Sequence, residues 1–175
     1  VNYGLFSADE DGATGRRYHA VRLVRDFDMQ NLGAMLTRVD DPWRDREATV
    51  LGVDPNWRTS PRWNVRTRLL GSRIDQAGDA LQDYGATVWA DYEMDHGWRQ
   101  QWIAMHFGND LQLNDFGYLS RNDLNYGHWE VGRRFTDLPA GSRYASKDWR
   151  WRVSSVRNDH GQRLNDQFRM SRRSE

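Results

Sequence analysis

Side chains alternate between apolar and polar types with a period of two over residues 62–71. The odd positions carry Trp63, Val65, Thr67 and Leu69, and the even positions carry Arg62, Asn64, Arg66 and Arg68. A helix would mix these two sets around its circumference, whereas a strand places them on opposite faces. The run therefore predicts a β-strand with one apolar face and one charged face.

Residues 84–95 repeat this pattern. One set is Tyr84, Ala86, Val88, Ala90, Tyr92 and Met94, and the other is Gly85, Thr87, Trp89, Asp91, Glu93 and Asp95. A tyrosine near each end of an apolar face is typical of the aromatic girdles of membrane barrels. Both runs match the ~9–11 residues that a tilted strand needs to cross a bilayer and exceed the ~5–6 residues of a usual soluble strand.

Weaker strand patterns follow one another along the rest of the chain. They cover residues 1–6, 18–26, 31–39, 47–57, 98–107, 126–136, 148–157 and 163–170. Stretches rich in Asp, Asn, Gly and Pro separate them, and such residues favour reversal of the chain. We therefore predict an all-β fold, an antiparallel up-and-down meander in which residues 1–175 form a single segment of an outer-membrane β-barrel.

Composition excludes several classes of protein. The 25 basic and 25 acidic residues balance, which argues against a nucleic-acid-binding protein. With no cysteine, disulfide-linked partners and thiolate chemistry are excluded. Mean hydropathy is −0.94, yet aromatic residues make up 13% of the chain. A barrel that is apolar outside and polar inside reconciles these values, because half of each strand can be charged.

The run from Asn109 to Asp123 resembles a recurring segment of a bacterial outer-membrane family. In that family, a polar segment leads into an acidic residue, an apolar residue, Gly, an aromatic residue, Leu and then Arg-x-Asp. The matching residues here are Asp115, Phe116, Gly117, Tyr118, Leu119, Arg121 and Asp123. Residues 31–38 and 50–54 resemble two further elements of the same family. Its members carry a family-nine-type carbohydrate-binding-like domain followed by a long barrel-like region, domain of unknown function fifty-nine-sixteen.

This resemblance implies a location in the bacterial outer membrane, with the lipid bilayer as partner. It also implies a link to carbohydrate or another small solute. The carbohydrate-binding-like domain and a terminal aromatic residue are both absent, and the chain begins at Val1 without a signal peptide. We therefore expect an internal or C-terminal-region fragment of a longer protein. Four residues of the shared segment are expected to tie a turn together, namely Asp115, Gly117, Arg121 and Asp123.

Charged side chains of the two clearest strands form the candidate ligand site. The acids are expected to face the arginines of the neighbouring strand, either as a charged lumen that holds a solute or as a ladder of ion pairs that fixes the register. Trp129 is added as an aromatic ring for a sugar. The candidate ligand-binding residues are Arg62, Arg66, Arg68, Asp91, Glu93 and Trp129.

A catalytic use of the acids is the weaker interpretation. Neighbours two apart on a strand face, such as Asp91 and Glu93, are separated by roughly 6.5–7 Å, within the range of an inverting glycosidase. Nearby arginines would, however, lower the carboxyl pKa values, whereas a proton donor needs a raised pKa. We expect no catalytic residues.

Histidines and tryptophans are the remaining candidates for a binding site. No histidine pair has the i,i+4 spacing of a helical zinc site. His106 and His128 could meet across strands, but such histidines are usually only polar, and no metal and no cofactor are predicted. Five tryptophans are candidates either for stacking on sugars or for interfacial girdles: Trp98, Trp102, Trp129, Trp149 and Trp151. Adjacent Arg133 and Arg134 conflict with a membrane strand, because one of them must point toward lipid unless it lies at the interface.

Three functions remain open from the sequence. The first is an outer-membrane barrel segment, an envelope protein linked to glycan binding or uptake. The second is a soluble β-sandwich that binds carbohydrate, and the third is a glycan-cleaving enzyme.

Overall fold

The computed structural model describes residues 1–12 and 14–175, which form ten β-strands and two single 3₁₀ turns. The strands are β1 (Asn2–Asp9), β2 (Arg17–Phe27), β3 (Gln30–Asp41), β4 (Arg46–Ser60), β5 (Trp63–Gln76), β6 (Asp79–Glu93), β7 (Trp98–Phe107), β8 (Leu124–Phe135), β9 (Lys147–Arg157) and β10 (Arg163–Ser174). The 3₁₀ turns are η1 (Pro42–Arg44) and η2 (Asp95–Gly97).

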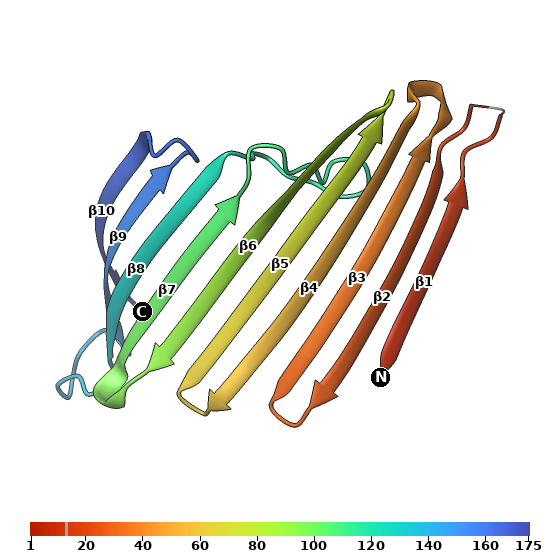
Figure 1. The fold of residues 1–175 in the computed structure, drawn as a ribbon. Helices are drawn as coiled ribbons and strands as arrows, with labels where there is room; N and C mark the ends of the chain where they lie inside the picture. Colours follow the sequence, from red (N-terminus) through yellow and green to blue (C-terminus); the bar gives the residue numbers. More distant parts are fainter. Residues whose placement is uncertain (13) are drawn as a thin grey trace.

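All ten strands form one sheet in which each strand pairs antiparallel with its neighbour in sequence. The strand order β1 to β10 confirms the predicted all-β, up-and-down meander, with 69% of the chain in strands. Figure 1 shows the strands running obliquely side by side, with the sheet curling over toward β9 and β10. The sheet is open, because β1 and β10 each have a strand on one side only in the described chain.

Strands occur at all ten predicted places, and several are longer than the alternation alone indicated. β4 and β6 each contain 15 residues and β5 contains 14. Strands of this length are more than twice as long as the ~5–6 residues usual in soluble proteins.

Tight turns connect the long hairpins. Between β5 and β6, Ala77 and Gly78 have φ values of 52° and 90°, which suit a two-residue connection whose twist matches the strands. The β2–β3 connection places Asp28 at a φ of 53°, a conformation that Asp tolerates better than most residues. Ala77 and Gly78 lie in a stretch predicted to reverse the chain, residues 75–79, whereas the turn at Asp28 was not predicted.

Few side chains are fully buried, and those in the strands lie on one face of the sheet. Val39, Ala48 and Ile74 form a small cluster against which Tyr18 and Phe116 pack. Because paired residues point to the same side, the register places Tyr18, Val39, Ala48 and Ile74 on one face. We call this face the inner face and the opposite one the outer face.

Candidate functional site

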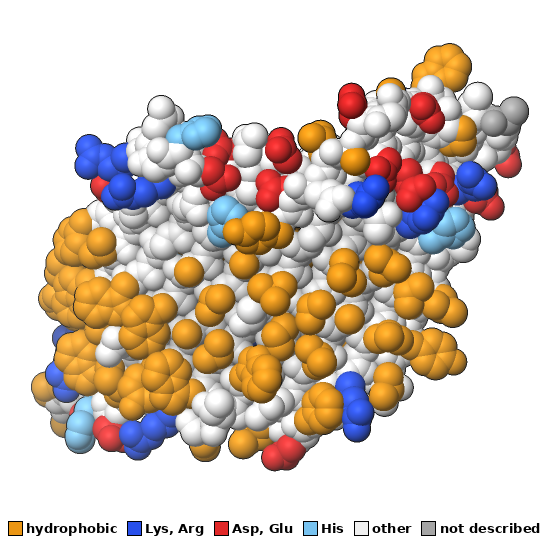
Figure 2. Space-filling view, in the orientation of Figure 1, with side chains coloured by type: hydrophobic (Ala, Val, Ile, Leu, Met, Phe, Trp, Pro, Cys, Tyr) orange, Lys and Arg blue, Asp and Glu red, His pale blue; other side chains and the backbone are white. Residues whose placement is uncertain are grey.

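The outer face carries a continuous band of exposed apolar side chains, which we call the apolar belt. Figure 2 shows it as a field of hydrophobic side chains across the sheet. The register places these residues on one side from β1 to β10. Its more exposed members include Leu5, Leu23, Leu32, Leu36, Leu51, Leu69, Val88, Trp129, Val153, Phe168 and Met170. Leu69 and Leu51, near the middle of long strands, are 50% and 52% exposed.

Charged side chains border the belt at the upper end of the strands. On the outer face, Arg38 pairs with Asp40 at 3.3 Å and with Glu47 at 2.6 Å. Further along, Arg73 pairs with Asp75 at 2.8 Å. These pairs lie at the level where β3, β4 and β5 meet their connections. The apolar belt therefore ends at a charged upper rim, which is also visible in Figure 2.

Aromatic rings border the belt at the lower end. Trp63 stacks on Tyr92 with ring centroids 4.4 Å apart, and on Trp102 at 5.8 Å. The outward-facing Arg133 lies near this end, where its guanidinium sits 5.3 Å from the ring of Trp98. Arg134 points to the inner face and toward Glu175, at 3.5 Å. Of the two adjacent arginines, the outward-facing one therefore lies at the edge of the belt among aromatic rings.

The height of the belt can be estimated on β5. At a rise of ~3.3 Å per residue and a tilt of ~40°, the eight steps from Trp63 to Gly71 cover roughly 20 Å, somewhat less than the ~25 Å apolar band of bacterial outer-membrane barrels. The described residues contain no helix long and apolar enough to span a membrane.

The inner face is polar and its charges are paired across strands. Arg152 and Glu130 are 2.7 Å apart, and Arg99 and Asp148 are 2.9 Å apart. A longer bridge joins Arg22 on β2 to Asp54 on β4 at 2.7 Å, passing over Gly33 on β3. A Cβ atom at Gly33 would lie 2.6 Å from an Asp54 oxygen and 2.7 Å from Arg22 Nη2. The absence of a side chain at Gly33 therefore gives the Arg22–Asp54 ion pair room to form across β3.

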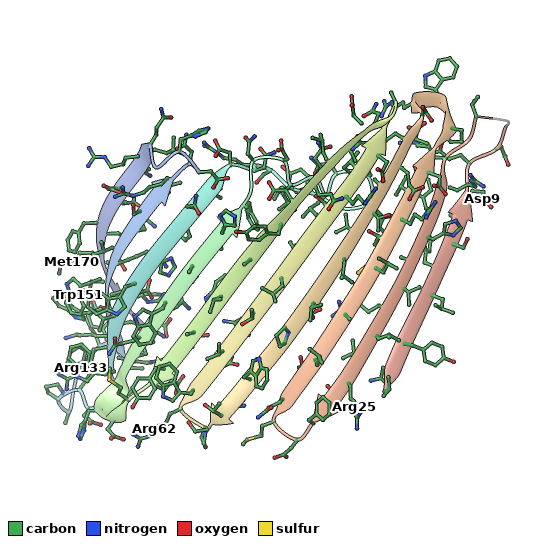
Figure 3. All side chains as sticks on the ribbon, in the orientation of Figure 1. Asp9, Arg25, Arg62, Arg133, Trp151 and Met170 are labelled. Atoms are coloured by element: carbon green, nitrogen blue, oxygen red, sulfur yellow. The ribbon has the colours of Figure 1, made fainter. Side chains whose placement is uncertain are left out.

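The structure brings together most of the candidate ligand residues. Arg66 pairs with Asp91 at 2.7 Å and Arg62 with Asp95 at 2.7 Å. Glu93 lies opposite Arg99, and both line an inner-face hollow of about 470 Å³ together with Arg62 and Asp91. Figure 3 shows Arg62 at the β4–β5 turn, at the lower end of the sheet.

Three candidates lie outside the 470 Å³ hollow. Arg66 and Arg68 border a second inner-face hollow, of about 320 Å³, that also includes Trp89 and Asn56. Trp129 lies on the outer face, where its indole nitrogen donates to Gln100 Oε1 at 3.0 Å. The structure therefore does not place Trp129 with the inward-facing charges, and it belongs to the apolar belt.

Asp91 is held as an ion-pair acceptor. Its Oδ2 accepts from Arg66 at 2.7 Å and its Oδ1 accepts from Gln101 Nε2 at 2.7 Å. Both oxygens of this carboxylate are therefore engaged in hydrogen bonds. His106 and His128, the one histidine pair considered, point to opposite faces. Among the described residues, no group of three metal-binding side chains occurs.

The connection between β7 and β8, residues 108–123, folds back against the inner face, and we call it the inner segment. Arg46 at the start of β4 holds it, with Nε 2.9 Å and Nη2 2.8 Å from the two Asp115 oxygens. The same guanidinium donates to Gln76 and Gln112, each at 2.9 Å. Leu111 is only 1% exposed. The inner segment is therefore part of the folded structure and not an outward loop.

The four residues of the shared motif lie in or beside this arrangement. Asp115 makes the ion pair with Arg46, and Gly117 N–H donates to Leu113 O at 2.8 Å. Asp123 Oδ1 accepts from the backbone of Asp159 at 2.8 Å, while Arg121 borders a hollow beside the segment. The sequence did not predict that the segment packs inward, although three apolar residues in a polar connection (Leu111, Leu113 and Phe116) were a signal that could have indicated it.

A substitution of Gly85 tests the packing of the inner segment. A Cβ at this position would lie 2.8 Å from Leu111 Cδ2 and 2.8 Å from Phe107 Cδ1. Because Leu111 is only 1% exposed and the backbone oxygen of His106 also lies 3.2 Å from the added atom, we expect Gly85→Ala to cost about 1–3 kcal/mol in the free energy of unfolding. Gly71→Ala is the matched control, since nothing lies within 4 Å of the added atom. Equal urea midpoints for the two variants of the full-length protein would contradict this packing.

Comparison with known proteins gives no relative: no family model, curated protein or solved structure matches this chain.

Proposed function

We propose that this chain forms part of the wall of a bacterial outer-membrane β-barrel. Its apolar belt contacts lipid and its inner face lines a polar interior. The observation that carries the proposal is the belt itself, which runs across all ten strands and is exposed on long strands of a meander. Monomeric soluble proteins rarely expose an apolar patch larger than a few hundred Å², whereas a bilayer covers such a surface.

The two borders of the belt support lipid as its occupant. Aromatic rings at the lower end suit the headgroup region, and ion pairs at the upper end remain in contact with water. The alternative, a soluble carbohydrate-binding sandwich, would need a second sheet against the outer face. The described chain forms a single sheet.

The inner face supports an interior that water and solutes can enter. Its ion pairs Arg66–Asp91, Arg99–Asp148 and Arg152–Glu130 have partly exposed side chains. In a bilayer, the free edges of β1 and β10 must be paired by further strands, because unpaired backbone groups are costly in hydrocarbon. We therefore propose an envelope protein that passes or holds a polar solute, such as a glycan.

Fractionation of cells tests the location. The full-length protein containing this sequence is expected in the outer-membrane fraction, to stay there after an alkaline carbonate wash, and to migrate faster on gels before heating than after it. Recovery in the soluble fraction would overturn the proposal and favour the carbohydrate-binding sandwich.

A further inference from the structure

We propose that the inner segment is a fixed constriction inside the barrel, which admits short sugars and excludes longer chains. This inference rests on the proposed function, because it needs the inner face to line an interior.

The inner segment crosses much of the wall. Its backbone at Asp110 bonds to Asp83 on β6 at 2.8 Å, and at Gln112 to Ser72 on β5 at 3.1 Å. The Phe116 ring then packs against β1 and β2, the first two strands of the sheet. Its centroid lies 6.0 Å from that of Tyr18 on β2 and 5.7 Å from that of Phe6 on β1.

The segment thus passes under the strands from β6 to β1, roughly 24 Å at ~4.8 Å per strand. Figure 1 shows the connection from β7 extending past the upper ends of β6 and β5 before it returns to β8. A chain lying across this width of the inner face takes up space at the upper mouth of the interior.

Several contacts fix the segment in place. The Arg46–Asp115 pair has side chains only 14% and 19% exposed. Gly108 makes room for the turn into the segment, since a Cβ there would collide with the Asp83 carboxylate. At the other end, Asp123 N–H donates to Gly108 O at 3.3 Å and closes the segment at its base. Because these contacts hold the segment at both ends, it narrows the interior as a fixed element and not as a mobile lid.

The space beside the segment determines the class of solute. It is a hollow of about 640 Å³ whose wall includes the amides of Gln112, Asn114 and Asn122 and the hydroxyl of Ser120. Amide groups both donate and accept hydrogen bonds, which matches the hydroxyl groups of sugars. Asp115 is paired with Arg46 within the same wall, while Arg44 and Arg121 add positive charge to it. A hollow of this size belongs to the ~300–1,000 Å³ range of small-molecule sites, so it suits a short sugar.

Liposome swelling with sugars of increasing length tests the constriction. The full-length protein is reconstituted, and swelling is followed with mono-, di-, tri- and tetrasaccharides. We expect fast swelling with the monosaccharide and a steep fall by the trisaccharide. Replacement of residues 112–121 by a short Gly-Ser linker is expected to raise tetrasaccharide swelling several-fold. The matched control shortens the connection at residues 138–143, at the opposite end of the strands, and is expected to leave the size profile unchanged.

A second variant guards against misfolding of the shortened protein. Ser120→Trp adds bulk at an exposed position of the hollow, and it is expected to slow disaccharide swelling while monosaccharide swelling falls less. An unchanged size profile in both variants would overturn the constriction. If liposomes swell with the shortened variant but with no sugar for the intact protein, the inner segment blocks the interior completely. That result would overturn the proposed passage of short sugars. Failure of the intact protein to insert into liposomes would instead overturn the proposed barrel.

Discussion

Replacement of Leu69 by arginine is expected to destabilise the membrane-inserted protein by about 2–4 kcal/mol, the cost of an arginine on the lipid face near the bilayer midplane. Leu69 lies on the outer face of β5 and is 50% exposed within the apolar belt. The measurement is the urea dependence of folding of the full-length protein into lipid vesicles, followed by its heat-dependent gel mobility.

Asn64→Arg is the matched control on the same strand. Asn64 points to the inner face and is paired in register with Asp91, so an added guanidinium finds water and a carboxylate there. We expect its effect on the free energy of unfolding to stay below about 1 kcal/mol, the usual contribution of a solvent-exposed ion pair. Equal costs for the two variants would show that the two faces of β5 do not differ in environment.

The second large effect is expected from Asp115→Ala, which leaves the Arg46 guanidinium largely buried without its carboxylate. Removing one partner of a buried ion pair costs about 3–5 kcal/mol, and we expect roughly 2–4 kcal/mol here because this pair keeps some exposure. The loss should appear locally, as faster hydrogen exchange at the amides of Gln112 and Gly117, which donate to Ser72 Oγ and Leu113 O.

Asp75→Ala is the control for this prediction. Asp75 also pairs with an arginine, Arg73 at 2.8 Å, but the two side chains are 40% and 56% exposed. Exposed pairs contribute about 0–1 kcal/mol, so this variant is expected to stay close to the parent protein. Unchanged exchange at Gln112 and Gly117 in Asp115→Ala would show that Arg46 does not hold the inner segment.

The sequence was sufficient for the strands because the alternation is a local property. Residues 62–71 and 84–95 separate apolar from charged side chains without help from distant contacts, and the register of β5 with β6 confirms both sets of faces. Turn residues such as Gly78 also act locally, through a positive φ that glycine adopts freely.

Contacts between distant parts of the chain could not be predicted in the same way. Arg46 and Asp115 are 69 positions apart, and only the folded sheet brings them together. Trp129 was grouped with inward-facing charges, yet its pairing with Trp102 sets it on the outer face. The alternation in β8 is weak, because Gly127 and Gly132 interrupt it, so its faces depend on the register with β7 and β9.

The central claim is that the apolar belt contacts lipid, and cysteine labelling along β5 tests it most directly. The described chain has no cysteine of its own, so single cysteines can be placed from Trp63 to Leu69 in the full-length protein. They are then labelled with a water-soluble maleimide in native outer membranes. We expect reaction at 64, 66 and 68, and protection at 63, 65, 67 and 69 that detergent removes. Protection of the odd positions that persists in detergent would mean that protein, and not lipid, covers the outer face.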